Sequence, residues 1–572
     1  MYDLKISNGT IIDGTGAPAI QGDLGIKDGK VVAMGEAPDA ATREIDAQGQ
    51  VVCPGFVDIH THYDAQVLWD RNLTVSPWHG VTTAVIGNCG FGVAPTKAAD
   101  RELIMRTLEK VEGMSVDALK AGLGEEWPFE TFPEYLDTID AVGPSINVGV
   151  LMGHTPLRLY VMGEAAMERA ATPEELARMC ELLEQGIKAG ALGFATSKAS
   201  THVGYEGRPV PSRAAAMDEM HALCDVLGDL DKGVIQVTVG REMFLDEFEQ
   251  IAERTGRPIT WTALLAGLSL GKGGHEEQLV QSEKLAARGL QITPQVTPRP
   301  LNFEYQFKAP FPFEAISMFK PGSAADFDGK CRLYKDPEFR AAFKERMKNI
   351  RTSFQSSFSL TVISQYLPEP ELAERRLFEV AAERDMDAID LALDLALSSD
   401  LEARFRMPVA NHDEDEVEPL LKSACTVLGL SDAGAHASQL CDACLPTYFL
   451  GRWVREKQAF TLEEAIRMLT SRTADVMGLT DRGRLALGKP ADVVVFDPDT
   501  VGDQPLQRVY DSPAGADRLI SEARGISNVI VNGTVIREHG ADAVPDGAPL
   551  PGQLLRGGAA AYLLSLAFQG EA

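Results

Sequence analysis

The sequence predicts an α/β fold, namely a (β/α)8 TIM-like barrel with a small β-sandwich domain formed from both chain termini. Eight short apolar runs alternate with helical stretches in the middle of the chain, and eight is the number of strands that such a barrel requires. Strand-and-turn patterns occupy both ends of the chain, and neither end alone could bury an apolar face.

The β-sandwich domain is expected to comprise residues 1–54 and 483–545. Near the N-terminus, turn residues at Asn8-Gly9, Asp13-Gly14 and Asp28-Gly29 separate short strands at 4–7, 10–12, 22–27 and 30–34. Near the other end, a strand at 491–496 precedes a hairpin whose turn is Asn532-Gly533.

The barrel is expected within residues 55–482. Two of its helices carry clear start signals, since Thr172-Pro-Glu-Glu and Thr461-Leu-Glu-Glu both fit a capping box. A gap at about 297–424 is far longer than an ordinary βα connection, which indicates an insertion, either a substrate-pocket module or a solvent-facing decoration. The eight apolar runs are 51–60, 81–87, 146–152, 191–196, 233–239, 258–264, 290–296 and 425–430.

Charge and cysteine usage exclude several classes of protein. The 572 residues carry 54 basic and 83 acidic side chains, a net charge of −29, which argues against binding to nucleic acid or an anionic membrane. Eight scattered cysteines are typical of a reducing compartment. The first residues lack a signal-peptide pattern and no run of 18 apolar residues occurs, so we expect a soluble cytoplasmic protein. The sequence leaves open whether the protein forms a homo-oligomer.

The most informative motif is Pro54-Gly-Phe-Val-Asp-Ile-His-Thr-His. His60 and His62 follow an apolar strand at a spacing of two, so their imidazoles project to the same side of the chain. At the carboxyl end of a barrel strand they can share one metal ion, and imidazole is the commonest ligand for zinc. The alternative is a structural pair of histidines.

Two further residues join this metal hypothesis. Asp432 ends the eighth run and would project into the same mouth, where a carboxylate can ligate the metal and take a proton from water. Its alternative role is a helix N-cap. Cys89 follows the second run in a glycine-rich loop, and its thiolate would be a strong zinc ligand. Its alternative role is a small buried apolar residue.

Other side chains near the predicted strand ends are candidates for substrate binding. His154 follows the third run, Lys198 and His202 follow the fourth, and His436 lies four residues after Asp432. Arg158 is one of several arginines suited to hold a substrate carboxylate. Most of these could equally be surface or helix-capping residues.

These motifs together resemble the amidohydrolase superfamily, specifically its N-acyl-D-amino-acid deacylase (D-aminoacylase) branch. The resemblance covers nearly the whole chain, including Gly80-Val-Thr-Thr, Gly87-Asn-Cys-Gly, Gly153-His-Thr-Pro-Leu-Arg, Ser431-Asp-Ala-Gly-Ala-His and Gly488-Lys-Pro-Ala-Asp-Val. It implies that His60, His62, Cys89 and Asp432 are metal-site residues, with Asp432 as the general acid and base.

The sequence departs from that family pattern at two strands. The family carries a histidine at the end of strand five and another at the end of strand six, but those ends here read Val234-Ile-Gln-Val-Thr-Val and Ile259-Thr-Trp-Thr-Ala-Leu. We therefore predict a single Zn²⁺ per chain, with Gln236 filling the vacated space, where it is a further candidate for substrate binding.

The expected activity is metal-dependent hydrolysis of a C–N amide bond, with deacylation of an N-acyl-D-amino acid as the first hypothesis. The expected partner is a small acylated substrate. A cyclic amidase of the hydantoinase or dihydropyrimidinase kind is one alternative, and a non-catalytic scaffold that kept the barrel is another.

Overall fold

A computed structural model describes residues 1–560 apart from 241, 314–315, 324 and 350–351. The chain divides into two compact units. The first comprises Met1–Leu264, Leu270–Pro298 and Glu418–Ala572, and the second comprises Leu265–Ser269 and Arg299–Val417. Among the described residues, no helix combines the length and the apolar character needed to cross a membrane.

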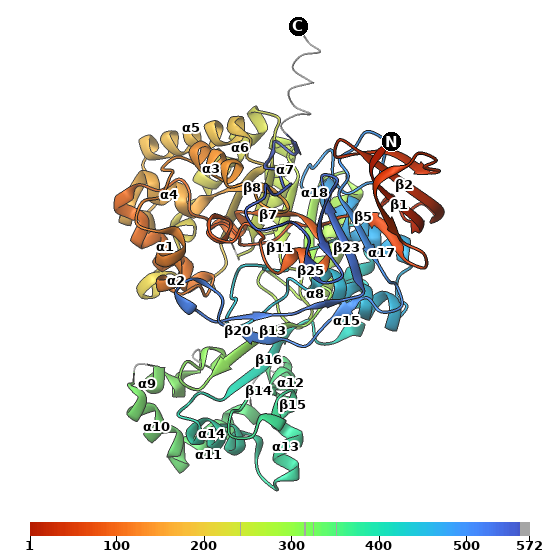
Figure 1. The fold of residues 1–572 in the computed structure, drawn as a ribbon. Helices are drawn as coiled ribbons and strands as arrows, with labels where there is room; N and C mark the ends of the chain where they lie inside the picture. The colour runs from red at the N-terminus through yellow and green to blue at the C-terminus, as the bar shows by residue number, and fades with distance from the viewer. Residues whose placement is uncertain (241, 314–315, 324, 350–351, 561–572) are drawn as a thin grey trace. The chain divides into compact units, whose positions relative to one another are not determined.

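Strands from both ends of the chain form one sheet in the first unit (Figure 1). The two ends meet where β18 pairs antiparallel with β5, with Val494 opposite Cys53. The order is β25-β24-β23-β18-β5-β1-β2-β3, and β4 pairs with β1. The strands are β1 (Tyr2–Ile11), β2 (Ile20–Lys27), β3 (Lys30–Gly35), β4 (Ala41–Asp46), β5 (Val51–Pro54), β18 (Val493–Phe496), β23 (Ile526–Val531), β24 (Thr534–Glu538) and β25 (Ala541–Asp542).

Two of the predicted turns are confirmed and one is wrong. Asp28-Gly29 joins β2 to β3 and Asn532-Gly533 joins β23 to β24, and in each pair both residues have positive φ, as a type I′ turn requires. Asn8-Gly9 does not end a strand. β1 continues through it, and the register against β2 shifts there, because Asn8 at φ 59° accommodates a β-bulge.

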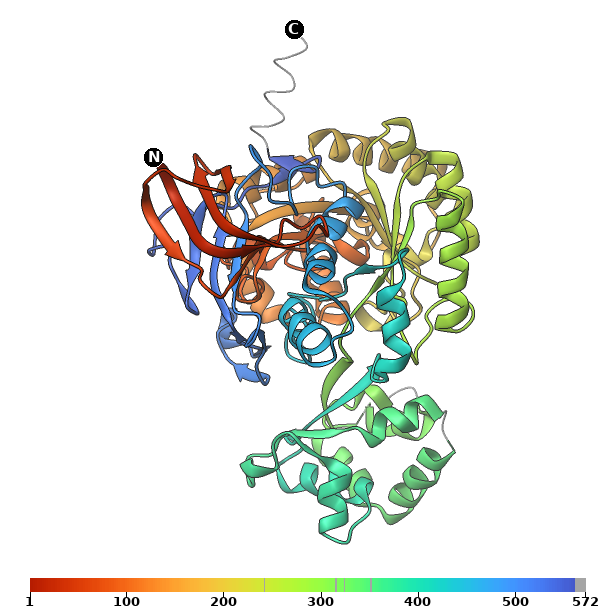
Figure 2. The same cartoon turned by 90° about the vertical axis from the view of Figure 1, so that its right-hand side faces the viewer.

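A second sheet in the first unit has eight parallel strands and is curled in a way that fits a TIM barrel (Figure 2). Its two edge strands approach each other just beyond their ends, where Thr61 forms a parallel bridge with Ala433. The order is β17-β12-β11-β10-β9-β8-β7-β6. The strands are β6 (Phe56–Asp58), β7 (Val81–Ile86), β8 (Asn147–Gly153), β9 (Gly193–Ser197), β10 (Val234–Thr238), β11 (Ile259–Thr262), β12 (Ile292–Val296) and β17 (Val427–Leu428).

Each predicted apolar run contains one of these strands, but the first run is divided between the two sheets. Residues 51–54 form β5 of the terminal sheet, and β6 of the curled sheet begins only at Phe56. Gly55 separates them because a Cβ there would lie 2.0 Å from Thr82 Oγ1. The chain thus passes from one sheet to the other at a position that only glycine can occupy.

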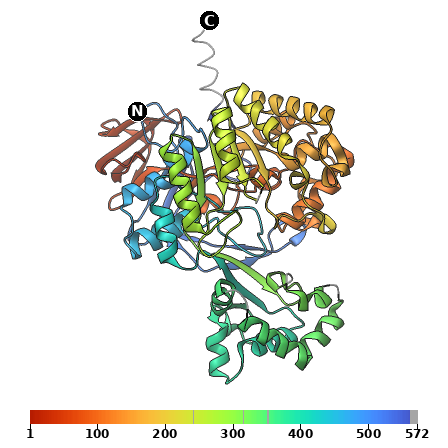
Figure 3. The same cartoon turned by 180° about the vertical axis from the view of Figure 1, so that it is seen from behind.

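The helices of the first unit pack along the outer side of the curled sheet (Figure 3). The capping boxes predicted at Thr172 and Thr461 are confirmed at the starts of α5 and α17. The α-helices of this unit are α1 (Arg101–Val111), α2 (Val116–Leu123), α3 (Phe132–Val142), α4 (His154–Met162), α5 (Pro173–Ala189), α6 (Met217–Asp229), α7 (Leu245–Thr255), α8 (His275–Ala287), α16 (Leu445–Tyr448), α17 (Leu462–Leu469) and α18 (Ser471–Val476). A further helix, α15 (Glu414–Lys422), begins in the second unit and ends in the first.

The second unit has its own sheet and core, and its larger segment, Arg299–Val417, lies within the predicted insertion. Its sheet order is β13-β16-β14-β15. An aromatic cluster that includes Tyr305, Phe307 and Phe405 is buried in its core. The elements are β13 (Leu301–Gln306), α9 (Lys320–Ser323), α10 (Phe327–Lys335), α11 (Pro337–Lys348), α12 (Thr352–Ser359), β14 (Val362–Gln365), β15 (Arg375–Arg376), α13 (Leu377–Glu383), α14 (Ala388–Ser398) and β16 (Arg404–Ala410).

Candidate metal centre

The His-x-His pair lies just past the end of β6, inside the first unit. Thr61 between the two histidines donates its backbone N–H to Val85 O (3.1 Å) and forms the bridge to Ala433, so the segment is held from both sides. His60 and His62 are both buried, and their ring centroids lie 5.3 Å apart. The expectation that the two rings share one side of the chain is met.

Cys89 approaches the same point from the turn after β7. Its Sγ lies 3.3 Å from His60 Nε2. The turn is tight because a Cβ at Gly87 would lie 2.1 Å from Leu151 O and a Cβ at Gly90 would lie 2.7 Å from Thr196 Cα. Cys89 itself has φ 57°, a conformation that is unfavourable for a side chain with a Cβ.

Asp432 reaches the cluster from the opposite edge strand. Its Oδ1 lies 3.3 Å from His60 Nε2 and 3.7 Å from His62 Nε2. Ser431 secures the connection, since its Oγ donates to the carbonyl oxygen of His60 (2.9 Å). The alternative role of Asp432 as a helix N-cap is wrong, because the next helix of this described stretch, α16, begins only at Leu445.

The donor atoms of this cluster fit a metal ion. The ligand atoms of His60, His62 and Cys89 all lie within 4.8 Å of one another. Two imidazoles, a thiolate and a carboxylate are the donor types that zinc prefers. The cluster is largely buried, and its geometry supports metal binding.

The electrostatics of the cluster favour positive charge at this point. Burial alone would raise the pKa of Cys89, but His60 and His62 bring it down to about 6. Burial would also raise the pKa of Asp432, yet both histidines lower it to about 2. Burial lowers the pKa of His60, while Cys89 and Asp432 raise it above the ordinary value. A cation, whether a metal ion or protons on the imidazoles, is stabilised here.

Each histidine has a polar partner at its second ring nitrogen, and the sequence interpretation missed both partners. His60 Nδ1 lies 2.8 Å from Gln295 Oε1 on β12, and His62 Nδ1 lies 3.2 Å from Glu112 Oε1 after α1. Metal-bound histidines usually have such a partner at the other nitrogen. A glutamine inside the apolar run 290–296 was a usable signal for Gln295, but nothing in the sequence around Glu112 pointed to this contact.

Gln236 lies within β10, and Lys198 follows the end of the neighbouring strand β9. Gln236 on β10 is fully buried, and its Oε1 accepts a hydrogen bond from Cys89 N (2.7 Å). Lys198 follows β9, and its Nζ donates to Arg213 O (3.3 Å) and to Ala215 O. Burial lowers the pKa of Lys198 to about 8. Gln236 therefore contacts a metal-ligand candidate directly, whereas the amine of Lys198 binds two backbone carbonyls.

His154 and Arg158 share a buried carboxylate that the sequence interpretation missed. His154 Nε2 lies 2.8 Å from Glu219 Oε1, and Arg158 donates to Glu219 Oε2. Arg158 also donates to Arg169 O (2.8 Å), and both predicted residues are fully buried on α4. Their proposed contact with substrate stays a prediction, and the contacts seen here are internal.

His202 and His436 lie close to the cluster. His202 Nδ1 lies 2.7 Å from Ser197 Oγ, and burial together with His436 and His62 lowers the pKa of His202 to about 3. Burial lowers the pKa of His436 to about 4 as well. Both rings are therefore neutral near pH 7, and neither adds charge to the cluster.

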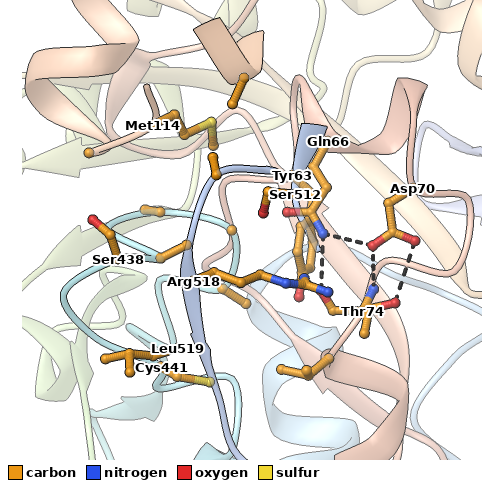
Figure 4. Close-up of a pocket in the computed structure, with 18 of the residues that line it drawn as sticks. Tyr63, Gln66, Asp70, Thr74, Met114, Ser438, Cys441, Ser512, Arg518 and Leu519 are labelled. Carbon is orange, nitrogen blue, oxygen red and sulfur yellow. Dashed lines mark hydrogen bonds between the residues drawn. The ribbon is translucent and has the colours of Figure 1, made fainter. Parts of the chain in front are cut away.

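A cavity of about 560 Å³ opens beside Asp432 within the first unit (Figure 4). Met114, Ser438 and Leu519 lie on one side of it, and Arg518 lies near Asp70 and Thr74. The Arg518 guanidinium donates to both carboxylate oxygens of Asp511 (2.7 and 2.8 Å) and to Thr74 O (2.9 Å). The cavity is therefore lined by the candidate catalytic carboxylate and by both apolar and charged side chains.

Known proteins resemble this chain over almost its whole length. The model of the Amidohydrolase family matches residues 43–329 and 371–537. The chain belongs to the amidohydrolase family. The D-aminoacylase of Alcaligenes xylosoxydans xylosoxydans is 30% identical to it over 544 residues, 94% of each chain. The N-acyl-D-glutamate deacylase of the same organism is 30% identical over 567 residues, 97% of this chain and 96% of the relative.

A solved structure of this family has the same fold. The N-acyl-D-glutamate deacylase of Bordetella bronchiseptica, in complex with zinc and a phosphonate inhibitor, aligns with a TM-score of 0.66 at 28% identity. The alignment covers 97% of this chain and 99% of that one. Membership of the family confirms the expected amidohydrolase.

Proposed function

We propose that this chain is a metal-dependent hydrolase that removes the acyl group from an N-acyl amino acid, of the N-acyl-D-amino acid type. The observation that carries this proposal is the convergence of His60, His62 and Asp432 from the two edge strands of the curled sheet. The full-length similarity to deacylases of N-acyl-D-amino acids supports the same class of substrate.

The proposed metal is a single Zn²⁺ held by His60, His62, Cys89 and Asp432. Zinc in such a site supplies Lewis acidity, which polarises the acyl carbonyl and makes water a better nucleophile near neutral pH. The absence of histidines from β10 and β11, where Gln236 and Thr262 stand instead, is the reason to expect one ion and not two.

Asp432 is proposed to move the proton. Its carboxylate would accept a proton from the water that attacks the acyl carbon, and would return that proton to the nitrogen of the leaving amine. The C–N bond breaks, a C–O bond forms, and the products are a carboxylic acid and a free amine. The low pKa of Asp432, about 2, keeps its carboxylate ionised at neutral pH.

The substrate is proposed to occupy the cavity beside Asp432. Its volume of about 560 Å³ suits a small acylated molecule. His154, Arg158, Lys198, His202, Gln236 and His436 remain proposed substrate residues. Of these, His202 and His436 have the stronger support, because both rings lie near enough to Asp432 for its carboxylate to influence their pKa.

The decisive experiment is a substrate screen with metal-loaded protein. N-acyl-D-amino acids, their L-enantiomers and hydantoins are incubated separately, and the released amine or acid is measured. Release from N-acyl-D-amino acids supports the proposal, and release from hydantoins alone supports the cyclic amidase. Purified protein with near-zero zinc and no turnover would favour the scaffold.

Three further proposals concern the domains, the cellular location and the assembly of the protein. Residues 1–54 and 483–545 are proposed to form a β-sandwich domain, and residues 55–482 a closed (β/α)8 barrel with an insertion at about 297–424. The protein is also proposed to act in the cytoplasm, where its cysteines would stay reduced. We also propose that the protein assembles into a homo-oligomer, and light scattering would measure its mass in solution.

A further inference from the structure

Two buried glutamines direct their amide oxygens at the metal-ligand candidates from inside the curled sheet. Gln236 on β10 contacts Cys89, and Gln295 on β12 contacts His60. Both side chains are fully buried. We propose that Gln236 and Gln295 are positioning residues that fix Cys89 and the ring of His60 for metal binding. This inference rests on the proposed metal-dependent function.

The orientation of the Gln295 amide decides which nitrogen of His60 carries a hydrogen. Gln295 Nε2 donates to Thr260 Oγ1 (3.2 Å), and Gln295 Oε1 faces His60 Nδ1 at 2.8 Å. A carbonyl oxygen only accepts, and His60 Nδ1 must therefore be the donor. In neutral His60, Nε2 is then the nitrogen with the free lone pair, and this tautomer is the one that binds a metal through Nε2.

The free nitrogen faces the other ligand candidates. His60 Nε2 lies 3.3 Å from Cys89 Sγ and 3.3 Å from Asp432 Oδ1. The lone pair on His60 Nε2 and the ionised carboxylate of Asp432 would repel each other unless a cation lay between them. Gly429 leaves room for this arrangement, since a Cβ there would lie 2.7 Å from Gln295 Oε1.

Gln236 acts on the backbone of Cys89. Cys89 has φ 57°, a conformation that is unfavourable for a residue with a Cβ and persists only when its surroundings hold it. Cys89 N donates to Gln236 Oε1 at 2.7 Å, and Gln236 Nε2 contacts Thr262 Oγ1 at 3.5 Å. Gln236 thus lies in the middle of strand five, which lacks the ligand histidine of the family pattern, and holds the backbone of a ligand candidate instead.

The first test is zinc affinity, measured by competition between full-length metal-free protein and a chromophoric chelator. Gln295→Met keeps the size of the side chain but removes the acceptor, and its zinc dissociation constant should rise about 10- to 100-fold. Gln295→Glu keeps an acceptor and should stay closer to wild type. The matched control is Gln278→Met, since Gln278 is equally buried but binds the backbone carbonyls of Lys272 and Gly273.

The outcomes separate this inference from the proposed function. Wild-type protein that binds no zinc overturns the proposed function, and the positioning role with it. Wild-type protein that binds zinc, with Gln295→Met binding equally tightly, overturns the positioning role alone. Gln236→Met should also weaken zinc binding, and unchanged affinity in that variant removes Gln236 from the inference.

A second measurement needs no substitution in either glutamine and so does not depend on a variant that folds. Nitrogen NMR of wild-type protein labelled with ¹⁵N-histidine reports which ring nitrogen is protonated. The His60 signal, assigned by its loss in His60→Gln, should show Nδ1–H. A signal from Nε2–H in zinc-loaded protein would overturn the role of Gln295.

Discussion

His60 Nε2 and Asp432 Oδ1 lie 3.3 Å apart, although they follow the first and the last strands of the curled sheet. Thr61 and Ala433 bridge the same two strands, and Ser431 Oγ donates to the carbonyl of His60. The contact between the imidazole and the carboxylate is therefore a consequence of the curl that brings the sheet edges together.

Replacing Asp432 by Asn should lower kcat about 10²- to 10⁴-fold, because an amide cannot take a proton from water. The melting temperature and the circular dichroism spectrum should stay close to wild type, since the side chain is partly exposed and lies at the cavity. Steady-state kinetics on the best substrate measures the effect. Wild-type turnover in this variant would remove Asp432 from the mechanism.

Replacing Cys89 by Ser should weaken zinc binding by more than about 10-fold, since even outer partners of a ligand contribute that much. Cys224 offers a matched control, because it is also buried but burial raises its pKa to about 12, whereas the pKa of Cys89 is about 6. Chelator competition with Cys89→Ser and Cys224→Ser makes the comparison. Equal affinities in the two variants would show that Cys89 is not a ligand.

Filling the cavity should impair substrate binding without disturbing the metal. Met114→Trp adds bulk to the wall, and kcat/KM should fall about 10- to 200-fold, as expected for steric exclusion in a substrate pocket. Zinc content, measured by mass spectrometry, should equal that of wild type. Met386→Trp is the control, because Met386 is exposed on the second unit. Unchanged kinetics in Met114→Trp would place the substrate elsewhere.

The buried Glu219 should make stability depend on pH in acid. Burial raises its pKa, but His154 and Arg158 lower it to about 2, below the ordinary value of 4.5. Its contribution is therefore fully present above about pH 4.5 and is lost as the pH falls towards 2. Glu219→Gln should cost about 3–5 kcal/mol of unfolding free energy near pH 7, because Arg158 loses its partner.

Urea denaturation of wild type and Glu219→Gln between pH 3 and pH 7 checks this prediction. The difference in unfolding free energy should be constant above about pH 5 and should shrink in more acidic buffer. A difference that grows as the pH falls would contradict the assigned sign.

Sequence reasoning recovered the parts of this molecule that depend on local pattern. Apolar runs located the eight strands of the curled sheet, and the spacing of two put His60 and His62 on one side. The division of the first run between two sheets was missed, because it depends on the clash at Gly55 with Thr82, which comes from another strand.

The missed parts of the site depend on tertiary contacts. Glu112 and Gln295 face the second ring nitrogens of the two histidines, but each lies far from them in the sequence. The carboxylate of Glu219, on another helix, accepts a hydrogen bond from Arg158, and sequence reasoning did not find this contact. The partner of a buried guanidinium can be identified only from the folded structure.

The pairing of β5 with β18 has a consequence for synthesis on the ribosome. A nascent chain that stops short of Asp432 contains the two histidines but lacks the carboxylate that faces them. β18, which pairs with β5 and ends at Phe496, is synthesised later still. Partial chains should therefore be inert towards substrate, and catalytic competence should arise only late in translation.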